Sequence, residues 1–177
     1  MTYTRLDQAG RQWPCPTEDH PGTPLLHVEA FAHAARARLQ CVEYQQTPEQ
    51  ATPQYPLLLI TGRSLYQFNA GTMTGRTPNS ALRPCDLLEI SADDALSLGV
   101  TNGEQARIVS QYGSTVLPVR VSGAVARGQL FATFQTSEFH VNALTGPHRD
   151  AITDTPEYKV TAVRVERFVA DRPVTAV

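Results

Sequence analysis

Short apolar runs and stretches of alternating apolar and polar residues recur along the chain, a pattern typical of β-strands. The wholly apolar run at 57–60 lies between a proline and a glycine, which favours a strand buried on both faces. Further strands are expected at 38–43, 87–90, 105–110, 115–121, 129–134 and 160–165. Ser91 and Gly99 delimit one short helix, because serine caps helix starts and glycine commonly ends helices. Six or seven short strands with one or two short helices predict a mainly β protein built as a closed barrel.

The beginning of the chain follows another pattern. Seven of the 13 prolines fall within the first 56 residues, which indicates extended and irregular backbone. We therefore expect an extended arm and linker at 1–54 with one strand at 38–43, a barrel domain at 55–170 and a tail at 171–177.

Composition and charge narrow the function classes. No apolar run approaches the roughly 20 residues of a membrane helix, so no membrane insertion is expected. The net charge of −2 provides no global positive field, so no nucleic-acid partner is expected. Three widely spaced cysteines lack metal-site spacing and favour free thiols in a reducing compartment. With no export signal at the N-terminus, we predict a cytoplasmic protein without a metal site of its own.

One long stretch has the chemistry of an anion site. Residues 50–85 contain no acidic residue but include Arg63, Arg76 and Arg83 together with glycines and hydroxyl side chains. Glycine lets backbone N–H groups approach an oxyanion, hydroxyls donate hydrogen bonds, and arginine binds phosphate in a bidentate manner. The alternative is a flexible surface loop that lacks acids by chance. Standard phosphate-loop and dinucleotide motifs are absent, so a nucleotide would be held in some other way.

Two later segments are also candidates. The polar residues 133–149 again follow a strand, and they are either an ordinary connection or part of a site. Lys159 is the only lysine in the chain and follows Tyr158, which suits an anionic or heteroaromatic group. No nucleophile elbow or zinc-protease motif occurs, so no catalytic residue is predicted.

Taken in order, several segments resemble the C-terminal domain of molybdenum or tungsten formate dehydrogenases, within the molybdopterin oxidoreductases. The segments that carry this resemblance are residues 12–16, 21–23, 55–57, 61–63, 71–74, 94–99, 103, 128, 133–134, 142, 144–145 and 156–165. The Gln-Trp-Pro-Cys-Pro arm and the Thr-Pro-Glu-Tyr-Lys segment resemble formate dehydrogenase more than nitrate reductase.

The resemblance implies a six-stranded double-psi β-barrel that binds and positions a bis-molybdopterin guanine dinucleotide carrying molybdenum or tungsten. The residues it implies as cofactor-binding are Thr61, Gly62, Arg63, Gln67, Asn69, Gly71, Thr74, Phe134, Gln135, Asn142, Tyr158 and Lys159. In the family, the iron–sulfur cluster, the metal ligand and the catalytic residues lie in upstream domains. The resemblance therefore implies partner domains or subunits of a formate dehydrogenase that oxidises formate to CO₂, and no catalysis by this chain alone.

The sequence also allows two other hypotheses about function. The chain can be the cofactor domain of another molybdopterin oxidoreductase, such as a nitrate reductase. It can also be a stand-alone double-psi barrel that docks a partner protein without cofactor.

Overall fold

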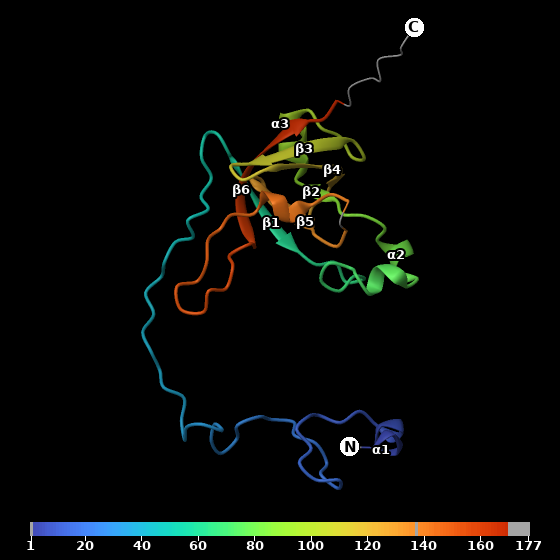
Figure 1. The fold of residues 1–177 in the computed structure, drawn as a ribbon, viewed down its shortest axis with the longest axis vertical. Coiled ribbons are helices and arrows are strands. Elements are labelled where there is room, and N and C mark those ends of the chain that lie inside the picture. Colours follow the sequence, from blue (N-terminus) through green and yellow to red (C-terminus); the bar gives the residue numbers. More distant parts are fainter. Residues whose placement is uncertain (1, 137, 170–177) are drawn as a thin grey trace. The chain divides into compact units, whose positions relative to one another are not determined.

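The computed structural model describes residues 2–136 and 138–169, and its contacts divide the chain into two compact units, 1–45 and 46–177 (Figure 1). Each unit is described by itself. The predicted domain bounds at 54 and 170 stay predictions, and the tail predicted at 171–177 lies outside the described residues.

The first unit has no buried side chain among its described residues. It contains the short helix α1, Tyr3–Gln8, which the sequence pattern did not predict. Polar contacts hold it, such as the Arg5 guanidinium donating to the His20 carbonyl at 2.6 Å. The strand predicted at 38–43 is wrong: these residues are exposed and form no strand, because alternation stabilises a strand only where another strand pairs with it.

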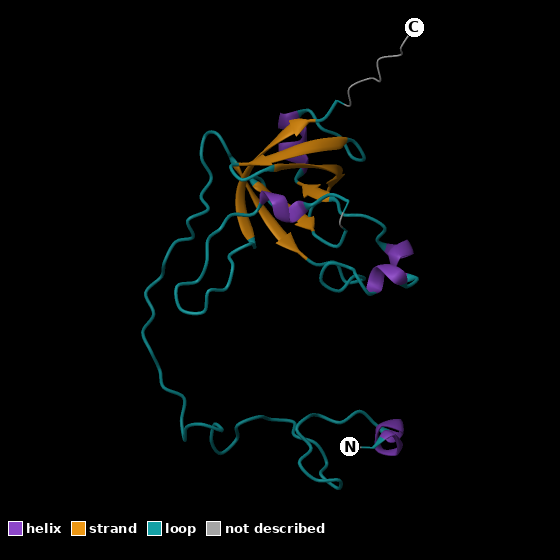
Figure 2. Cartoon of the chain, viewed as in Figure 1, coloured by secondary structure: helices purple, strands orange, loops and turns teal. Residues whose placement is uncertain are grey.

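The second unit is a closed barrel of six strands (Figures 1 and 2). The strands are β1 Leu57–Gly62, β2 Leu88–Ile90, β3 Gln105–Ser110, β4 Ser114–Val121, β5 Gln129–Thr133 and β6 Val160–Arg167, in the spatial order β1-β5-β2-β4-β3-β6. The pairs β1·β5 and β2·β4 are parallel, and the other four are antiparallel. The prediction of a mainly β, six-stranded barrel is confirmed.

The core lies inside this barrel. Every strand contributes buried apolar side chains, and the largest fully buried ones are Leu59, Leu88, Ile90, Ile108, Leu117, Leu130 and Val163. Strand β1 is not equally buried on both faces as predicted: Leu57, Leu59 and Thr61 are buried, whereas Leu58 and Ile60 are half-buried. Barrel closure explains the difference, because alternate side chains of each strand face inward and outward.

Helix α3, Ala92–Leu98, forms as the sequence predicts. The Ser91 hydroxyl accepts from the Asp94 N–H at 3.2 Å, and Gly99 takes the left-handed conformation at φ 67°. Asp94 is buried and also accepts from the Gly128 N–H at 2.7 Å, so the helix start is attached to the turn before β5.

The connections hold three further short elements. The stretch predicted as one long loop after β1 contains the 3₁₀ turn η1, Thr74–Arg76, and the helix α2, Asn79–Leu82, and the 3₁₀ turn η2, Val141–Leu144, follows β5. Within the described part of the chain, no helix is long and apolar enough to cross a membrane.

Candidate functional site

Two adjoining clefts open at one end of the barrel. The smaller, of about 540 Å³, is lined by Arg63, Asn69, Ala70, Phe134, Asn142, Thr145, Gly146, Pro156, Tyr158 and Lys159. The larger, of about 960 Å³, is lined by Ala70, Gly71, Thr72, Gly75, Arg76, Ser114, Phe134, Gln135, Thr136, His140, Val141, Asn142 and Ala143. They share Ala70, Phe134 and Asn142, so together they form one continuous depression.

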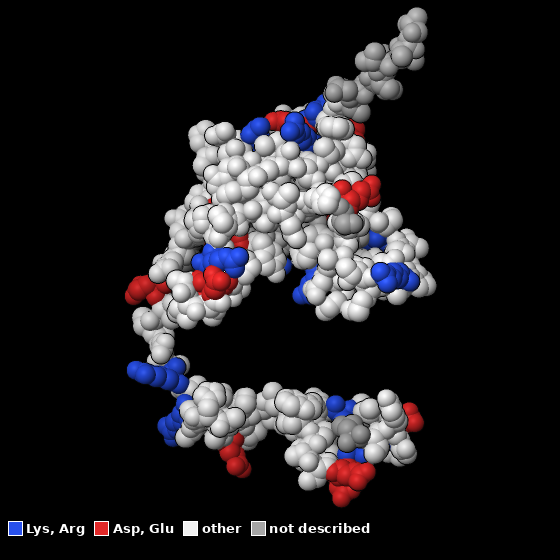
Figure 3. Space-filling view, viewed as in Figure 1, with Lys and Arg blue, Asp and Glu red and all other residues white. Residues whose placement is uncertain are grey.

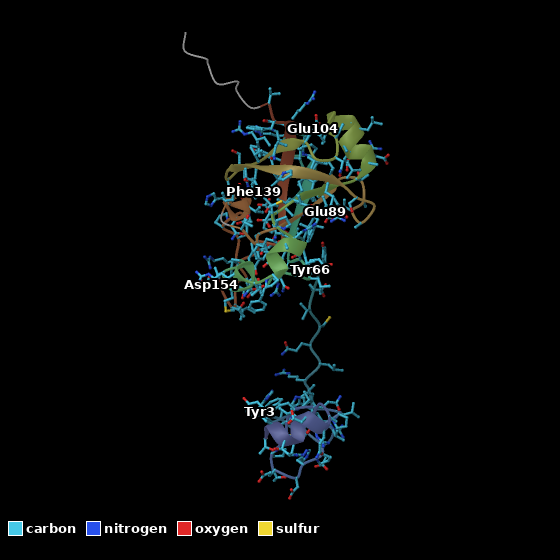
Figure 4. All side chains as sticks on the ribbon, turned by 90° about the vertical axis from the view of Figure 1, so that its right-hand side faces the viewer. Tyr3, Tyr66, Glu89, Glu104, Phe139 and Asp154 are labelled. Carbon is cyan, nitrogen blue, oxygen red and sulfur yellow. The ribbon has the colours of Figure 1, made fainter. Side chains whose placement is uncertain are left out.

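The figures locate this depression on the barrel. Figure 3 shows the surface hollowed between the lobe with the 146–158 loop and the lobe with α2. Figure 4 shows Tyr66 and Asp154, one from each bordering loop, at the same end of the barrel, and Glu104 at the other end. The loops after β1 and before β6 meet at the clefts because β1 and β6 are neighbouring antiparallel strands.

The clefts are electrostatically one-sided. None of the described residues that line them is acidic, while Arg63 and Lys159 line the smaller and Arg76 the larger. Within the described residues, none of these three cations has a carboxylate at ion-pair distance. Unneutralised cations at a cleft attract phosphate and bind it through charge-assisted hydrogen bonds.

Aromatic rings surround the lysine of the smaller cleft. The Lys159 ammonium lies 5.6 Å from the centroid of the Phe134 ring and 5.1 Å from that of Tyr158. The two rings meet edge to face with their centroids 6.3 Å apart. Lys159 and the two rings thus place a positive charge beside flat apolar faces, an arrangement that suits a ligand with both phosphate and heterocyclic parts.

Arg63 is oriented by its own loop. Its guanidinium donates to the Asn69 side-chain oxygen at 2.9 Å and lies 5.7 Å from the centroid of the Phe68 ring. Both Arg63 and Asn69 line the smaller cleft, so the predicted acid-free stretch does supply a preorganised cation there.

Four of the twelve predicted residues support the clefts instead of lining them. Buried Thr61 donates through its hydroxyl to the Tyr158 carbonyl at 2.6 Å, and a Cβ on Gly62 would lie 2.5 Å from the Phe131 ring. The Thr74 hydroxyl donates to the side-chain oxygen of buried Gln67 at 2.5 Å. These four residues fix the chain that presents the lining side chains.

Gly71 marks a close approach of two loops. Its φ is +68°, and a Cβ there would stand 2.5 Å from the Gln135 carbonyl oxygen. The structure therefore requires glycine at this point of the larger cleft. Gln135, another predicted residue, is itself buried, and its amide donates to the Arg83 carbonyl at 2.9 Å.

The sequence analysis missed Asp86, a fully buried carboxylate behind the wall that both clefts share. It accepts from the Gln135 N–H at 2.9 Å, from the Thr136 N–H at 2.9 Å and hydroxyl at 2.7 Å, and from the Thr133 hydroxyl. The available signal was its position as the first acid after a long acid-free stretch. Asp86 fixes the segment that carries Phe134.

Arg76, His140 and Cys85 lie outside the twelve predicted residues. Arg76 and His140 line the larger cleft; both fall in candidate segments of the sequence, but neither is among the twelve residues that the resemblance implied. Cys85 lies next to Asp86 in sequence. Burial, reinforced by Asp86 and opposed by Arg83, raises the pKa of the Cys85 thiol, so the thiol stays protonated at neutral pH.

Comparison with known proteins identifies the family. A sequence model described as "Molydopterin dinucleotide binding domain" matches residues 57–162, a range that includes all twelve predicted site residues. The chain belongs to this family. The description names a molybdopterin dinucleotide as the ligand, and the acid-free clefts with their cations and aromatic faces fit such a group.

Relatives in this family are larger enzymes. The chain is 37% identical to F420-dependent formate dehydrogenase 2 subunit alpha of Methanococcus maripaludis, and the alignment covers 95% of this chain and 25% of that protein. It is 30% identical to periplasmic nitrate reductase of Desulfovibrio desulfuricans, and that alignment covers 94% of this chain and 24% of that protein. The chain thus spans about a quarter of the length of these relatives.

A solved structure supports the fold alone. Acetylene hydratase from Pelobacter acetylenicus superposes with a TM-score of 0.56 at 18% identity, covering 64% of this chain and 18% of that one. Within the described residues, no group of three or more His, Cys, Asp or Glu side chains is arranged to hold a metal ion.

Proposed function

We propose that this domain binds and positions a bis-molybdopterin guanine dinucleotide, carrying molybdenum or tungsten, as the C-terminal domain of a formate dehydrogenase catalytic subunit. The observation that carries the proposal is the pair of acid-free clefts with unneutralised Arg63, Arg76 and Lys159, in a domain of a dinucleotide-binding family. The formate dehydrogenase relative supports this substrate over nitrate, because it shares more identical residues with the chain than the nitrate reductase does. The cytoplasmic location predicted from the sequence is part of the same proposal.

The lining residues divide the work of binding. Arg63 and Lys159 hold phosphate oxygens at the smaller cleft, and Arg76 does so at the larger. Phe134 and Tyr158 pack against heterocyclic rings, while Asn142, shared by both clefts, offers amide hydrogen bonds. The remaining contacts come from Asn69, Gly71 and Gln135, with Thr61, Gly62, Gln67 and Thr74 behind them.

The chemistry itself belongs to the cofactor and to other parts of the enzyme. When bound, the cofactor supplies a metal centre able to take two electrons from formate. This domain contributes orientation and electrostatics. Its partners are the remaining domains or subunits of the enzyme, which hold the catalytic residues and the iron–sulfur cluster.

Retention of the cofactor by the intact protein, purified from the cells that make it, tests the proposal. Lys159→Ala and Arg63→Ala are each expected to weaken cofactor binding about tenfold, because each removes charge-assisted hydrogen bonds to phosphate. The measurement is guanine nucleotide released by acid, and molybdenum or tungsten by mass spectrometry, per mole of protein after long dialysis.

The matched control is Arg167→Ala. Arg167 pairs with Glu104 at 3.1 Å, and Glu104 lies at the end of the barrel away from the clefts (Figure 4). This variant is expected to retain as much nucleotide and metal as the wild type. Wild-type retention by both cleft variants would contradict the proposal.

A nitrate reductase cofactor domain is the second candidate, because the nitrate reductase relative also aligns with 94% of the chain. Assays of the intact protein with formate and a dye acceptor, and with nitrate and a reduced dye, distinguish the two. Turnover of nitrate without turnover of formate would replace the first substrate by the second.

A further inference from the structure

A hairpin-shaped loop leads directly into the smaller cleft. At its base the Glu157 N–H donates to the His148 carbonyl at 2.8 Å, and Arg149 and Pro156 form a β-bridge. The leg before His148 continues back to Thr145 and Gly146, which line the cleft. The leg after Glu157 continues to Tyr158 and Lys159, which line it too. The position of the hairpin base therefore sets where both groups of lining residues lie.

Residues 47–49, here called the strap, hold this base from a distant part of the sequence. The Glu49 carboxylate lies 3.3 Å from the His148 ring nitrogen Nε2 on one leg. The Thr47 hydroxyl donates to the Glu157 carboxylate on the other leg. Two strap residues thus contact the two residues that face each other across the hairpin base.

Glu49 also anchors the strap to the barrel. Only 3% of Glu49 is exposed, and its Oε2 accepts from the Ala162 N–H of β6 at 2.8 Å. Its Oε1 accepts from the Tyr112 hydroxyl at 2.5 Å. A carboxylate so buried is stabilised only by such partners, so its position is strongly determined.

Tyr112 extends this contact to the cleft wall. A Cβ on Gly146 would stand 2.7 Å from the Tyr112 ring, so the ring packs directly against a lining residue. Burial and the hydrogen bond to Glu49 raise the pKa of Tyr112. The phenol consequently keeps its proton and remains a donor to Glu49.

We propose that Glu49 is a positioning residue for the smaller cleft: through His148 and Tyr112 it fixes the hairpin base, and with it the residues that line the cleft. The identity of the ligand in the cleft rests on the proposed function, whereas the attachment of the hairpin is independent of it. Nothing in the sequence pattern around Glu49 marks it, because its partners lie 63, 99 and 113 residues further along the chain.

Hydrogen exchange of the intact protein tests the attachment. Glu49→Ala is expected to speed amide exchange about tenfold in residues 146–158, because it removes hydrogen bonds to a charged group, and to leave β3 and β4 unchanged. Glu49→Gln is expected to restore most of the protection, since its amide oxygen can accept from Ala162 and its N–H can donate to Tyr112 or His148. Glu104→Gln, at the far end of the barrel, is the charge-matched control and is expected to match the wild type.

Cofactor retention by the same variants tests the consequence. Glu49→Ala is expected to lower retained guanine nucleotide about three- to tenfold, and Glu49→Gln to stay near the wild type. Should Glu49→Ala fail to fold, Thr47→Val provides the second variant. It loses the hydroxyl that donates to Glu157 and that accepts from the Glu49 N–H at 3.2 Å, but it keeps the Glu49 carboxylate, and it is expected to speed exchange at 157–159.

The outcomes separate the two proposals. If Glu49→Ala speeds exchange throughout the barrel, or does not speed it in residues 146–158, the positioning role is overturned, whatever the cofactor retention. A loosened hairpin with unchanged retention also overturns it, provided that Lys159→Ala lowers retention. If Lys159→Ala and Arg63→Ala leave retention unchanged, the proposed function fails, while the exchange result still decides whether Glu49 holds the hairpin.

Discussion

The interior of the barrel and the segments that border its clefts are stabilised by different forces. The interior is filled by aliphatic side chains such as Leu59 and Leu130, which are completely buried. The bordering segments bury polar groups instead, with Gln67, Asp86 and Gln135 each less than a tenth exposed and each hydrogen-bonded. Apolar burial thus stabilises the barrel, while directional hydrogen bonds determine the shape of the site.

Substitutions in the barrel interior should cost the most stability. Leu59→Ala is expected to lower the free energy of unfolding by about 2–5 kcal/mol, because it leaves a cavity in the core. Leu65→Ala is the matched control: Leu65 is 92% exposed in a cleft-bordering loop, and its loss is expected to change stability by less than about 0.5 kcal/mol. Urea denaturation measures both. Equal losses of unfolding free energy in the two variants would contradict the difference between the barrel interior and the loop.

A smaller effect is expected from the polar support of the clefts. Asp86→Asn keeps the shape but replaces one acceptor oxygen with a donor nitrogen, so buried donors lose their partner. We expect a loss of about 1–3 kcal/mol and faster hydrogen exchange at residues 134–136. Asp154→Asn is the control, because Asp154 is exposed and asparagine tolerates its positive φ of 56°. Exchange at 134–136 as slow as in the wild type would argue against the role of Asp86.

The smallest effect concerns the tip of the hairpin. Hydrogen bonds from the Thr153 N–H at 2.7 Å and hydroxyl at 2.9 Å, and from the Ile152 N–H at 3.0 Å, lower the pKa of Asp150. Because folding lowers the pKa of Asp150, its carboxylate stabilises the folded chain at every pH above the pKa that this group has in the unfolded chain. That stability is lost as the pH falls through the folded value. NMR titration is expected to give a midpoint below that of an unfolded peptide with the same sequence, and an equal midpoint would refute it.

What the sequence could predict follows the same division. The strands at 105–110 and 129–133 and the helix from Ala92 were predictable, because periodicity and capping are local signals of burial. The segment 38–43 has a similar alternation without any partner strand, so local pattern alone misled there.

The cations of the site were predictable from the sequence, but the buried carboxylates that support it were not. Arg63 and Lys159 stand out by an acid-free stretch and a lone lysine. The roles of Asp86 and Glu49 depend on hydrogen bonds to residues 50 and 113 positions away. No local pattern contains that information.

The pairing of β1 also dictates an order of events during synthesis. β1 is made first among the six strands, yet its neighbours are β5 and β6, and the Thr61 hydroxyl bonds to a residue 97 positions later. Closing such distant pairs is slow and must wait until the last strand has left the ribosome. The smaller cleft, which Tyr158 and Lys159 line, therefore takes shape only after β6 has been made, although the loop that forms its other side follows the first strand.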